Sequence, residues 1–426
     1  MASGEQGSLL PNNNCNDGLG VSSSTAHNSK YVSSKRYTTT PLILSLMGIG
    51  LLCFIIPLID RQQQSTSISG LSFLGKSKQQ HQTKAGKEKK YDCENDKSYS
   101  KHTLKSAYDL PYAALFKDTR GQKKFEASDV TIVNDAVYSV CDSSWAISKF
   151  TRDLVPFSDK NVQIGNPNRQ EEDSGYEAIF EHEGLFYVVR ESVYHNHHDN
   201  DQDDDDSVGK EKEDVGDYHA IIEELDLGED DYTVVRECKS EFVFEGDSKG
   251  FEGAVGFPDK NGVLYILGLC EGNHCSETKK NDIGNGRLVL MKKNEVKGTD
   301  CLWETVRGVS IPKSASFLDY SAIDITDEGR VAITSQEDSA VWLGHTSGIS
   351  NGIIDPGVFE FEDDDSSVML QFPKDGGCHT VYCNIEGIHW MNDDMLMAVS
   401  DKMKSKGRQD FRCHEKDQSI HAFVIP

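Results

Sequence analysis

The sequence predicts an all-β domain of the β-propeller type over residues 107–426, preceded by one N-terminal transmembrane helix. Two observations predict the domain. After residue 107, short runs of Val, Ile, Leu, Phe and Tyr are separated by Gly, Asp and Asn turns, and no long segment keeps a helical period. One sequence pattern also recurs along this part of the chain. An internal repeat of this size is typical of blades arranged around an axis.

The residues of the repeated pattern follow the same order in each copy. An aromatic or aliphatic residue precedes Glu or Ser, a small residue, an apolar residue, a polar turn, a β run and an acid. Copies begin at Tyr176, Phe251, Tyr320 and Ile385, with a weaker one at Ser128, and a further β run follows in most of them. A unit of three or four antiparallel strands cannot bury both faces alone, so the repeat predicts five blades. A sixth blade too degenerate to read is the alternative.

The last copy ends at its third strand, so another segment must supply the outer strand of that blade. Residues 109–117, DLPYAALFK, are placed to do so. Their pairing would close the ring and remove an open sheet edge.

Three segments precede the domain. Residues 1–40 are rich in Ser, Asn and Gly and predict a disordered cytosolic tail, whereas residues 60–106 combine low hydrophobicity with clustered lysines and predict a flexible stem. Residues 41–59 hold nineteen residues without a charge. At about 1.5 Å per residue they match the hydrocarbon core of roughly 30 Å, so they predict a transmembrane signal-anchor. A cleavable signal peptide is the alternative, but the region before the apolar run is long for one.

The cysteines indicate the compartment. Nine follow the predicted span, and two pairs, Cys270 with Cys275 and Cys378 with Cys383, have a spacing of five. Short-loop disulfides in an oxidising lumen explain this spacing, and we predict that Cys270 and Cys275 are joined. The odd count leaves at least one thiol free or paired between chains. A zinc site is the alternative, but both spacings exceed the usual two-residue gap.

Orientation follows from the same argument. Lys35 and Arg36 on the amino side of the span slightly outweigh Arg61 on the other, which favours a cytosolic amino terminus. We therefore expect a single-pass, type II membrane protein with its propeller in the secretory lumen or outside the cell. The absence of an Asn-x-Ser/Thr sequon after residue 60 argues in the other direction.

The charge balance excludes one class of partner. Asp and Glu number 70 against 44 Lys and Arg, a formal net charge of −26, and no basic stripe interleaved with aromatic residues occurs. Nucleic acid is therefore not an expected partner. The expected partners are the membrane, through residues 41–59, and a small-molecule or protein ligand on the propeller face.

Two sets of polar residues should meet on one face of the domain, because in each blade the first strand begins and the second ends there. Glu177, Glu252 and Glu386 open the first strand in three copies, and Ser128 and Ser321 take that place in the others. A purely structural role would be filled alike in every blade, so we expect the three glutamates to form a cation site. Calcium is the natural candidate because it prefers carboxylate and carbonyl oxygens.

The second set recurs in every copy and closes the second strand. Its members are Asp142, Glu191, Glu271, Glu337 and Asp401. Such regular recurrence favours a structural role, with each carboxylate accepting backbone N–H bonds from a neighbouring strand.

Cations and long loops should lie on the same face. Arg190, Lys402, Lys404 and Arg408 are the predicted ligand-binding residues, since they could bind a phosphate or carboxylate beside the glutamates. Three loops between second and third strands are long, and binding sites often form where such loops gather. The loop that begins at His195 contains three histidines beside an acidic run, which favours a solvated insert over a metal site.

No GxSxG, HExxH, Walker or GxGxxG motif occurs in a credible context, which argues against the main hydrolase and nucleotide-binding classes. The order EGI, polar turn, apolar strand and SD at Glu386 to Asp401, echoed at Glu252 and Glu177, resembles the repeats of the esterase-like phytase group and related secreted or membrane-anchored bacterial propellers. That resemblance implies a calcium-bearing acidic face acting on phosphate or carboxylate esters. Ser128 and Ser321 depart from its uniform motif.

Two functions are consistent with these features. The first is a membrane-anchored propeller that binds a ligand or protein partner on its acidic, loop-rich face. The alternative is a metal-assisted hydrolase of phosphate or carboxylate esters, in which the glutamates at the channel mouth act as metal ligands or general base.

Overall fold

The computed structural model describes residues 101–426, except 169–172, 197–215, 247–248, 272–274, 276–283, 285, 296–300, 405–408 and 410. The predicted tail, transmembrane segment and most of the stem therefore lie outside the described residues. Among the residues that are described, no helix is long and apolar enough to cross a bilayer. The described chain consists of β-strands, turns and short 3-10 helices, which confirms the all-β prediction.

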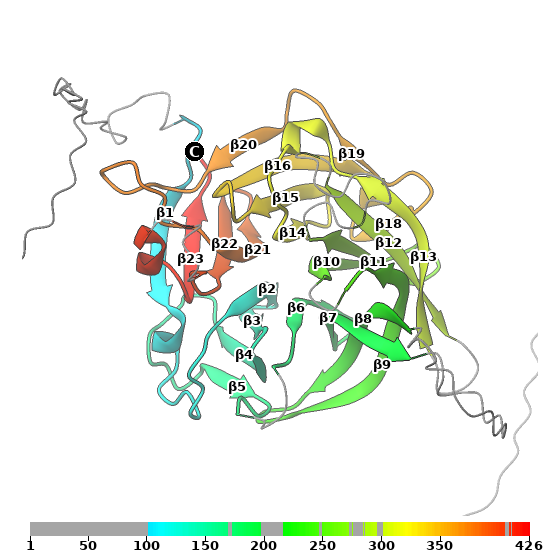
Figure 1. Cartoon of the computed structure of the whole chain (residues 1–426), viewed down its shortest axis with the longest axis horizontal. Helices are drawn as coiled ribbons and strands as arrows, with labels where there is room; N and C mark the ends of the chain where they lie inside the picture. Colours follow the sequence, from blue (N-terminus) through cyan, green and yellow to red (C-terminus); the bar gives the residue numbers. More distant parts are fainter. Residues whose placement is uncertain are drawn as a thin grey trace, which may run out of the picture. The chain divides into compact units, whose positions relative to one another are not determined.

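The strands form antiparallel units arranged around a central axis (Figure 1). The first unit contains β2 (Ala127–Val133), β3 (Ala136–Cys141), β4 (Ser144–Thr151) and β5 (Val162–Ile164). The second contains β6 (Tyr176–His182), β7 (Leu185–Asn196), β8 (Gly216–Leu227) and β9 (Tyr232–Phe244). The third contains β10 (Phe251–Pro258), β11 (Leu264–Cys270), β12 (Arg287–Glu295) and β13 (Cys301–Ser310).

Two more units complete the described part. The fourth contains β14 (Ala322–Ile325), β15 (Arg330–Ser335) and β16 (Ala340–Ser347), with β19 (Glu360–Glu362) and β20 (Val368–Gln371) both paired to β16. The fifth contains β21 (Ile385–Asn392), β22 (Met395–Ser400) and β23 (Ser419–Val424). A hairpin of β17 (Ile349–Ser350) and β18 (Ile353–Ile354) lies between β16 and β19 in the chain.

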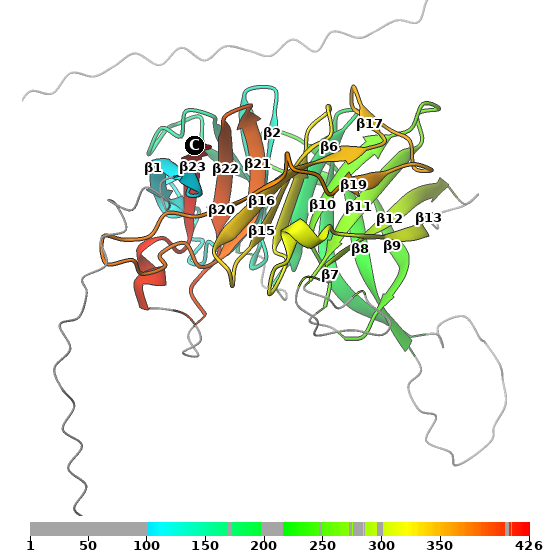
Figure 2. The same ribbon diagram turned by 90° about the horizontal axis from the view of Figure 1, so that it is seen from above.

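The innermost strands make a closed ring. β2 contacts β6, β6 contacts β10, β10 contacts β14, β14 contacts β21, and β21 returns to β2. Figure 2 shows the strands of neighbouring units standing beside one another across the disc. This arrangement is that of a β-propeller, and the predicted copies at Tyr176, Phe251 and Ile385 coincide with the starts of β6, β10 and β21.

The last unit is closed by the start of the domain, as predicted. β1 (Lys105–Pro111) pairs antiparallel with β23, with Asp109 opposite His421 and Pro111 opposite Ser419. The strand begins earlier than the expected 109–117, and Tyr112–Leu115 forms a 3-10 helix, η3. The boundary between stem and domain also lies earlier than residue 107, because Leu104 is buried and its N–H donates to the carbonyl of Gln371 at 2.9 Å.

Two units share one sheet. The outer strands β9 and β13 pair in parallel through Leu302 with Lys239 and Trp303 with Ser240, so β6 to β13 form one eight-stranded sheet. A disulfide between Cys238 and Cys301 crosses the same joint. The repeat contained no sign of this connection.

The predicted disulfide between Cys270 and Cys275 is present, with Cα atoms 5.8 Å apart. The other pair at the same spacing is not joined. Cys383 bonds to Cys413, and Cys378 is bonded to a different cysteine. Proximity in sequence was a poor guide here because the β22–β23 loop folds back over the start of β21. The odd count predicted a thiol that is either free or paired between chains, and Cys141 is a buried free thiol.

Candidate functional site

The three predicted glutamates occupy equivalent irregular positions. The pairing of β6 with β7 skips Glu177, that of β10 with β11 skips Glu252, and that of β21 with β22 skips Glu386. Each residue is therefore the extra residue of a β-bulge at the start of an innermost strand. A bulge re-aims its side chain out of the regular alternation, which is a common device beside binding sites.

The same irregularity places a serine in the ring. Ser128 is skipped in the pairing of β2 with β3, and its buried hydroxyl has no hydrogen-bond partner in the described structure. Ser321, just before β14, donates from its hydroxyl to the carbonyl of Ile385 at 2.8 Å. Five oxygen-bearing side chains, one from each unit, therefore stand at one end of the innermost strands.

The three carboxylates are half-buried, and none makes a hydrogen bond or ion pair within the described part of the chain. Burial, followed by the charges of Glu252 and Glu191, raises the pKa of Glu177 well above its ordinary value. Burial and the charge of Glu271 raise the pKa of Glu252 to about 8. Burial and Asp401 similarly raise the pKa of Glu386. The acids are close enough to repel one another, and the described residues offer them little compensation.

The end of the innermost strands where Glu177, Glu252 and Glu386 lie is called the mouth, and three further acids lie there. Burial and the charge of Asp401 raise the pKa of Asp142 to about 7, and burial raises that of Asp401 to about 6. One buried carboxylate oxygen of Asp142 and one of Asp401 lack a hydrogen-bond partner in the described structure. Burial also raises the pKa of Asp319 to about 6.

The acids expected to hold strand turns thus have mixed roles. Glu271 pairs with the ammonium group of Lys249 at 3.0 Å. At Glu337 it is the backbone N–H that takes part in the turn, as a donor to the carboxylate of Asp319. Asp142 and Asp401 have the unpaired oxygens just described. Asp319 was missed because it lies in the irregular segment before β14, outside the repeated pattern.

The four predicted ligand-binding cations are not all at the mouth. Arg190 is used within its own blade: it donates to the carbonyl of Ser174 at 3.0 Å, pairs with buried Glu223 at 3.2 Å and stacks 4.8 Å from the Trp145 ring. Arg408 lies outside the described residues.

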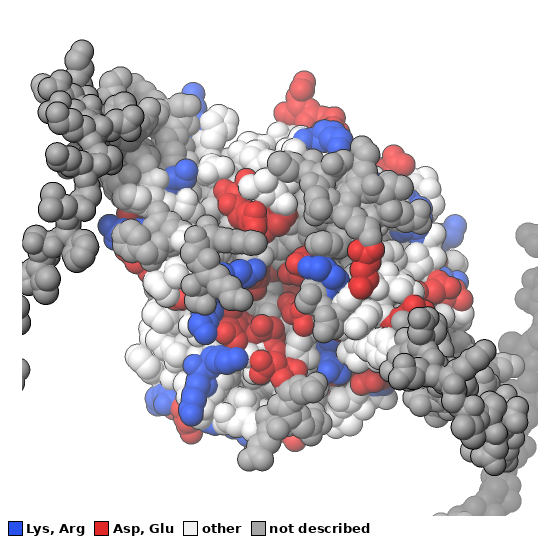
Figure 3. Space-filling model, viewed as in Figure 1, with Lys and Arg blue, Asp and Glu red and all other residues white. Residues whose placement is uncertain are grey.

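Lys402 and Lys404 remain at the mouth. The Lys402 ammonium lies 3.6 Å from a carboxylate oxygen of Glu126, and the Lys402 side chain is exposed. Partial burial opposes the charge of Lys404, but the carboxylates of Glu386 and Glu252 outweigh it and raise the pKa of Lys404. Figure 3 shows acidic side chains gathered at the centre of one face, with basic side chains among them.

The loop that carries these lysines is fixed by several contacts. Asn384 donates to the carbonyl of Lys402, and Gln409 accepts the N–H of Lys404 at 2.9 Å while donating to Asn384. The Cys383–Cys413 disulfide ties the end of the loop to the start of β21, two residues before Ile385. These contacts hold Lys402 and Lys404 beside Glu386, which follows Ile385 at the start of β21.

A preformed metal cluster and a separate pocket are the other candidates for a site. Among the described residues, no group of three or more His, Cys, Asp or Glu side chains converges as a ready metal centre, and this includes the three ring glutamates. A pocket of about 360 Å³ lies at the opposite end of β10, lined by Ile349, Ile353 and Ile354 with Asp259 and Lys260 at its rim. It contains none of the predicted residues.

Comparisons with known proteins leave the family open. No family model matches the sequence, and no curated protein is significantly similar to it. The resemblance to the esterase-like phytase group therefore stays a prediction.

Solved structures match over most of the domain with low scores. A luciferin-regenerating enzyme is 10% identical with a TM-score of 0.35, covering 75% of this chain and 95% of its own. YCF48 from Cyanidioschyzon merolae is 10% identical with a TM-score of 0.27, covering 70% and 66%. The extracellular domains 1–2 of Drosophila Semaphorin 1a are 9% identical with a TM-score of 0.30, covering 71% and 65%. The propeller architecture rests on the strand order and the ring of innermost strands.

Proposed function

We propose that the protein is a five-bladed propeller whose acidic mouth binds a calcium ion and, through that ion and Lys404, an anionic ligand. The observation that carries this proposal is the set of three half-buried glutamates, each on a bulge and each without a hydrogen bond or ion pair among the residues that the structure describes. Like charges at close range favour either protonation or a bound cation. Lumenal and extracellular fluids supply calcium, so the cation is the simpler solution.

The donor set suits calcium. Carboxylate and hydroxyl oxygens are the only side-chain donors at the five ring positions, and calcium takes six to eight oxygen ligands in flexible geometry. The unpartnered hydroxyl of Ser128 supports this fit, because a buried donor without a partner is costly unless a ligand satisfies it. Glu177, Glu252 and Glu386 would hold the ion, with Ser128 beside them.

The ligand should be a phosphate or carboxylate, with phosphate esters the better fit. A bound calcium ion would supply positive charge to an anionic group, and Lys402 and Lys404 could complete the contact as point charges. A dianionic phosphate can meet the ion and a lysine together, which a single carboxylate does less well.

Hydrolysis of such an ester is the second candidate. It is favoured by the pKa values of about 7 and about 6 for Asp142 and Asp401, because a carboxylate that titrates near neutrality can accept a proton from water at physiological pH. Strongly shifted carboxylates in a charged mouth are typical of catalytic sites, although ion networks also produce them.

We also propose that residues 41–59 anchor the chain as a type II, single-pass protein with the propeller in the secretory lumen or outside the cell. The disulfides at Cys238–Cys301, Cys270–Cys275 and Cys383–Cys413 support an oxidising compartment.

Calcium titration of the full-length chain tests the site. Wild-type thermal stability should rise with calcium, by about 2.7 kcal/mol at 100 times the dissociation constant. The triple change Glu177→Gln, Glu252→Gln and Glu386→Gln should abolish this rise. The charge-matched control changes three exposed acids, Glu328, Glu360 and Glu362, to Gln and should keep it. An absent response in wild type, or equal loss in both triples, would refute the cation site.

A screen of phosphate and carboxylate esters in calcium then separates binding from hydrolysis. Turnover that is lost in Asp142→Asn but not in the control triple would support a hydrolase. Ligand-induced stabilisation without turnover would support a binding module, and neither response would refute the anionic ligand.

A further inference from the structure

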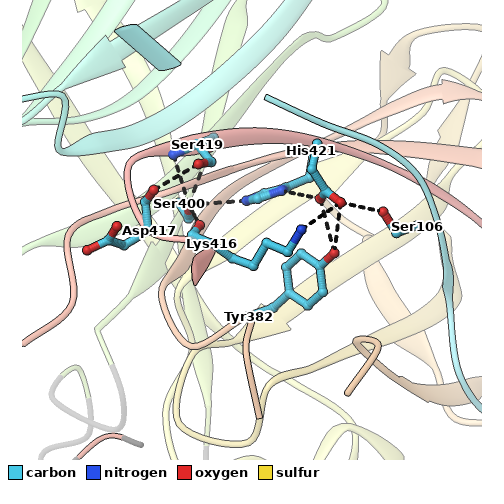
Figure 4. Close-up of polar contacts among 8 residues, drawn as sticks. Ser106, Tyr382, Ser400, Lys416, Asp417, Ser419 and His421 are labelled. Carbon is cyan, nitrogen blue, oxygen red and sulfur yellow. Dashed lines mark hydrogen bonds and ion pairs between the residues drawn. The ribbon is translucent and has the colours of Figure 1, made fainter. Parts of the chain in front are cut away.

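The closing strand β1 carries a carboxylate at the centre of a polar network (Figure 4). Asp109 accepts a hydrogen bond from Nδ1 of His421 at 2.8 Å and pairs with the Lys416 ammonium at 2.9 Å. The hydroxyls of Tyr382 and Ser106 also donate to it, at 3.0 and 2.7 Å. One side chain from the first strand of the domain thus joins four residues that belong to β1, β23 and the flanking loops.

The network continues through the histidine to β22. Nε2 of His421 lies 3.2 Å from the hydroxyl of Ser400, so serine, histidine and aspartate stand in the order of a nucleophilic triad. Ser400 and His421 are only 1% and 0% exposed, and the serine hydroxyl is committed to the carbonyl of Lys416 at 2.6 Å. No substrate carbonyl could reach that oxygen, so the arrangement does not act as a triad.

Three members of the network adjoin the acidic mouth. Ser400 directly precedes Asp401, and Tyr382 directly precedes Cys383, whose disulfide fixes the β22–β23 loop. Lys416 precedes Asp417, whose carboxylate accepts the N–H of Met403 at 3.3 Å, between Lys402 and Lys404. The charge on Asp109 is thus linked through Lys416 to the backbone that presents the mouth lysines.

We propose that Asp109 is a positioning residue, which acts through Lys416 and His421 to hold the β22–β23 loop so that Lys402 and Lys404 face the acidic mouth. The inference deepens the proposed function, since it rests on the mouth being the binding site. It also gives the closing strand a second role: besides sealing the last blade, the strand sets the geometry of the site.

The Lys416 contact is the part of the network that reaches the loop. The pair is half-buried, with side chains 27% and 23% exposed, so solvent screens it less than a surface ion pair. In Asp109→Asn the side-chain shape and one acceptor for His421 remain, but the attraction for Lys416 is lost. That change separates the positioning role from the sealing of the blade.

Amide hydrogen exchange on the full-length chain tests the proposal without requiring any ligand. In Asp109→Asn and in Lys416→Met, exchange in 401–404 and 411–418 should be about tenfold faster than in wild type. The double variant should be no faster than either single variant, because both changes break one contact. Lys416→Arg should restore slow exchange.

Two controls separate positioning from general loosening. Ser106→Ala removes one hydrogen bond to Asp109 and leaves Lys416 and His421 in place, so loop exchange should stay at the wild-type rate. Leu104→Ala removes a buried side chain directly before β1, so it should lower the melting temperature. It should leave loop exchange unchanged, because it does not alter the contact between Asp109 and Lys416. Loop exchange that is unaltered in Asp109→Asn, or equally fast in Leu104→Ala, would overturn the proposal.

Calcium affinity provides the second readout. If the mouth binds calcium, Asp109→Asn should weaken that affinity about fivefold, and Ser106→Ala should not. A wild-type chain that shows no calcium response would refute the proposed function, while loop exchange would still decide the positioning role. Normal calcium affinity together with normal loop exchange in Asp109→Asn would refute the inference and leave the calcium site standing.

Discussion

The units with glutamate at the mouth and the units with serine differ by more than that one residue. In the two serine-bearing units, the innermost strands β2 and β14 each carry a buried aspartate. Each of these aspartates accepts a hydrogen bond from a backbone N–H of the next blade. Asp129 accepts the N–H of Ile179 on β6 at 2.8 Å, and Asp324 accepts the N–H of Trp390 on β21 at 2.7 Å. Both carboxylates also accept a bond from the next residue of their own strand.

The other joints between blades use close approach instead. A Cβ added to Gly256 on β10 would lie 2.2 Å from the Phe180 ring of β6, and one added to Gly387 on β21 would lie 2.6 Å from Cα of Asp129. A Cβ on Gly253 would lie 3.0 Å from the backbone of Ile323. Asp129 and Asp324 bind backbone groups and hold the ring together, whereas Glu177, Glu252 and Glu386 make no hydrogen bond or ion pair among the described residues.

The largest expected effect comes from adding a side chain to a glycine where two blades approach closely. Gly387→Ala should lower the free energy of unfolding by about 3 kcal/mol, because the methyl group meets backbone that cannot move aside. Denaturant unfolding measures this loss, with or without calcium. An unchanged midpoint would show that the joint between β21 and β2 tolerates expansion.

Removing a buried aspartate of β2 or β14 should be the next largest effect. Asp324→Ala leaves the N–H groups of Trp390 and Ile325 without an acceptor and should cost about 2 kcal/mol. The loss should be independent of calcium in a denaturant titration. A calcium-dependent loss would place Asp324 in the mouth and break the distinction between the two kinds of acid.

The mouth acids should behave in the opposite way. Because their folded pKa values are raised, wild-type stability without calcium should be greatest below about pH 4.5 and fall as pH rises towards the pKa of about 8 for Glu252. The triple change to Gln should remove this decline and raise the melting temperature at pH 7 by roughly a few degrees. A variant that melts lower than wild type at pH 7 would contradict the repulsion.

The smallest expected effect lies at the network around Asp109. Burial lowers the pKa of His421, so the folded state resists its protonation and stability should decrease as pH falls below about 6.5. The effect should be clearest in the triple Gln variant, where the opposing trend of Glu177, Glu252 and Glu386 is gone and only that of Asp142, Asp319 and Asp401 remains. Denaturant unfolding at pH 7 and pH 5.5 measures it, and equal stabilities would contradict the assignment.

Much of the fold was predictable because the repeat encodes it locally. The order of apolar runs and turns identified the innermost strands, the closing role of the segment near Asp109, and Glu177, Glu252 and Glu386 as equivalent residues. The alignment of the repeat copies does not predict the contacts between blades. The parallel joint of β9 with β13 and the buried aspartates of β2 and β14 depend on contacts between units, which leave no periodic signal.

The contacts of Arg190 have a similar origin. Its sequence position suggested the mouth, whereas its guanidinium pairs with Glu223 and stacks on Trp145 within its own blade. Lys404 lies within electrostatic reach of Glu386 and Glu252, and its place three residues after Asp401 indicated this from the sequence. Asp319 and Glu126 were missed since each precedes its blade in a segment without a copy elsewhere.

The pairing of β1 with β23 has a consequence for biosynthesis. Lys105 is opposite Val424, so the segment that leaves the ribosome first among the described strands must wait for the one that leaves last. Until then the edge of β1 is unpaired and the ring is open. Translation of the whole domain therefore precedes its closure, and a chaperone that shields β1 during that interval would protect the nascent chain from pairing with a neighbour.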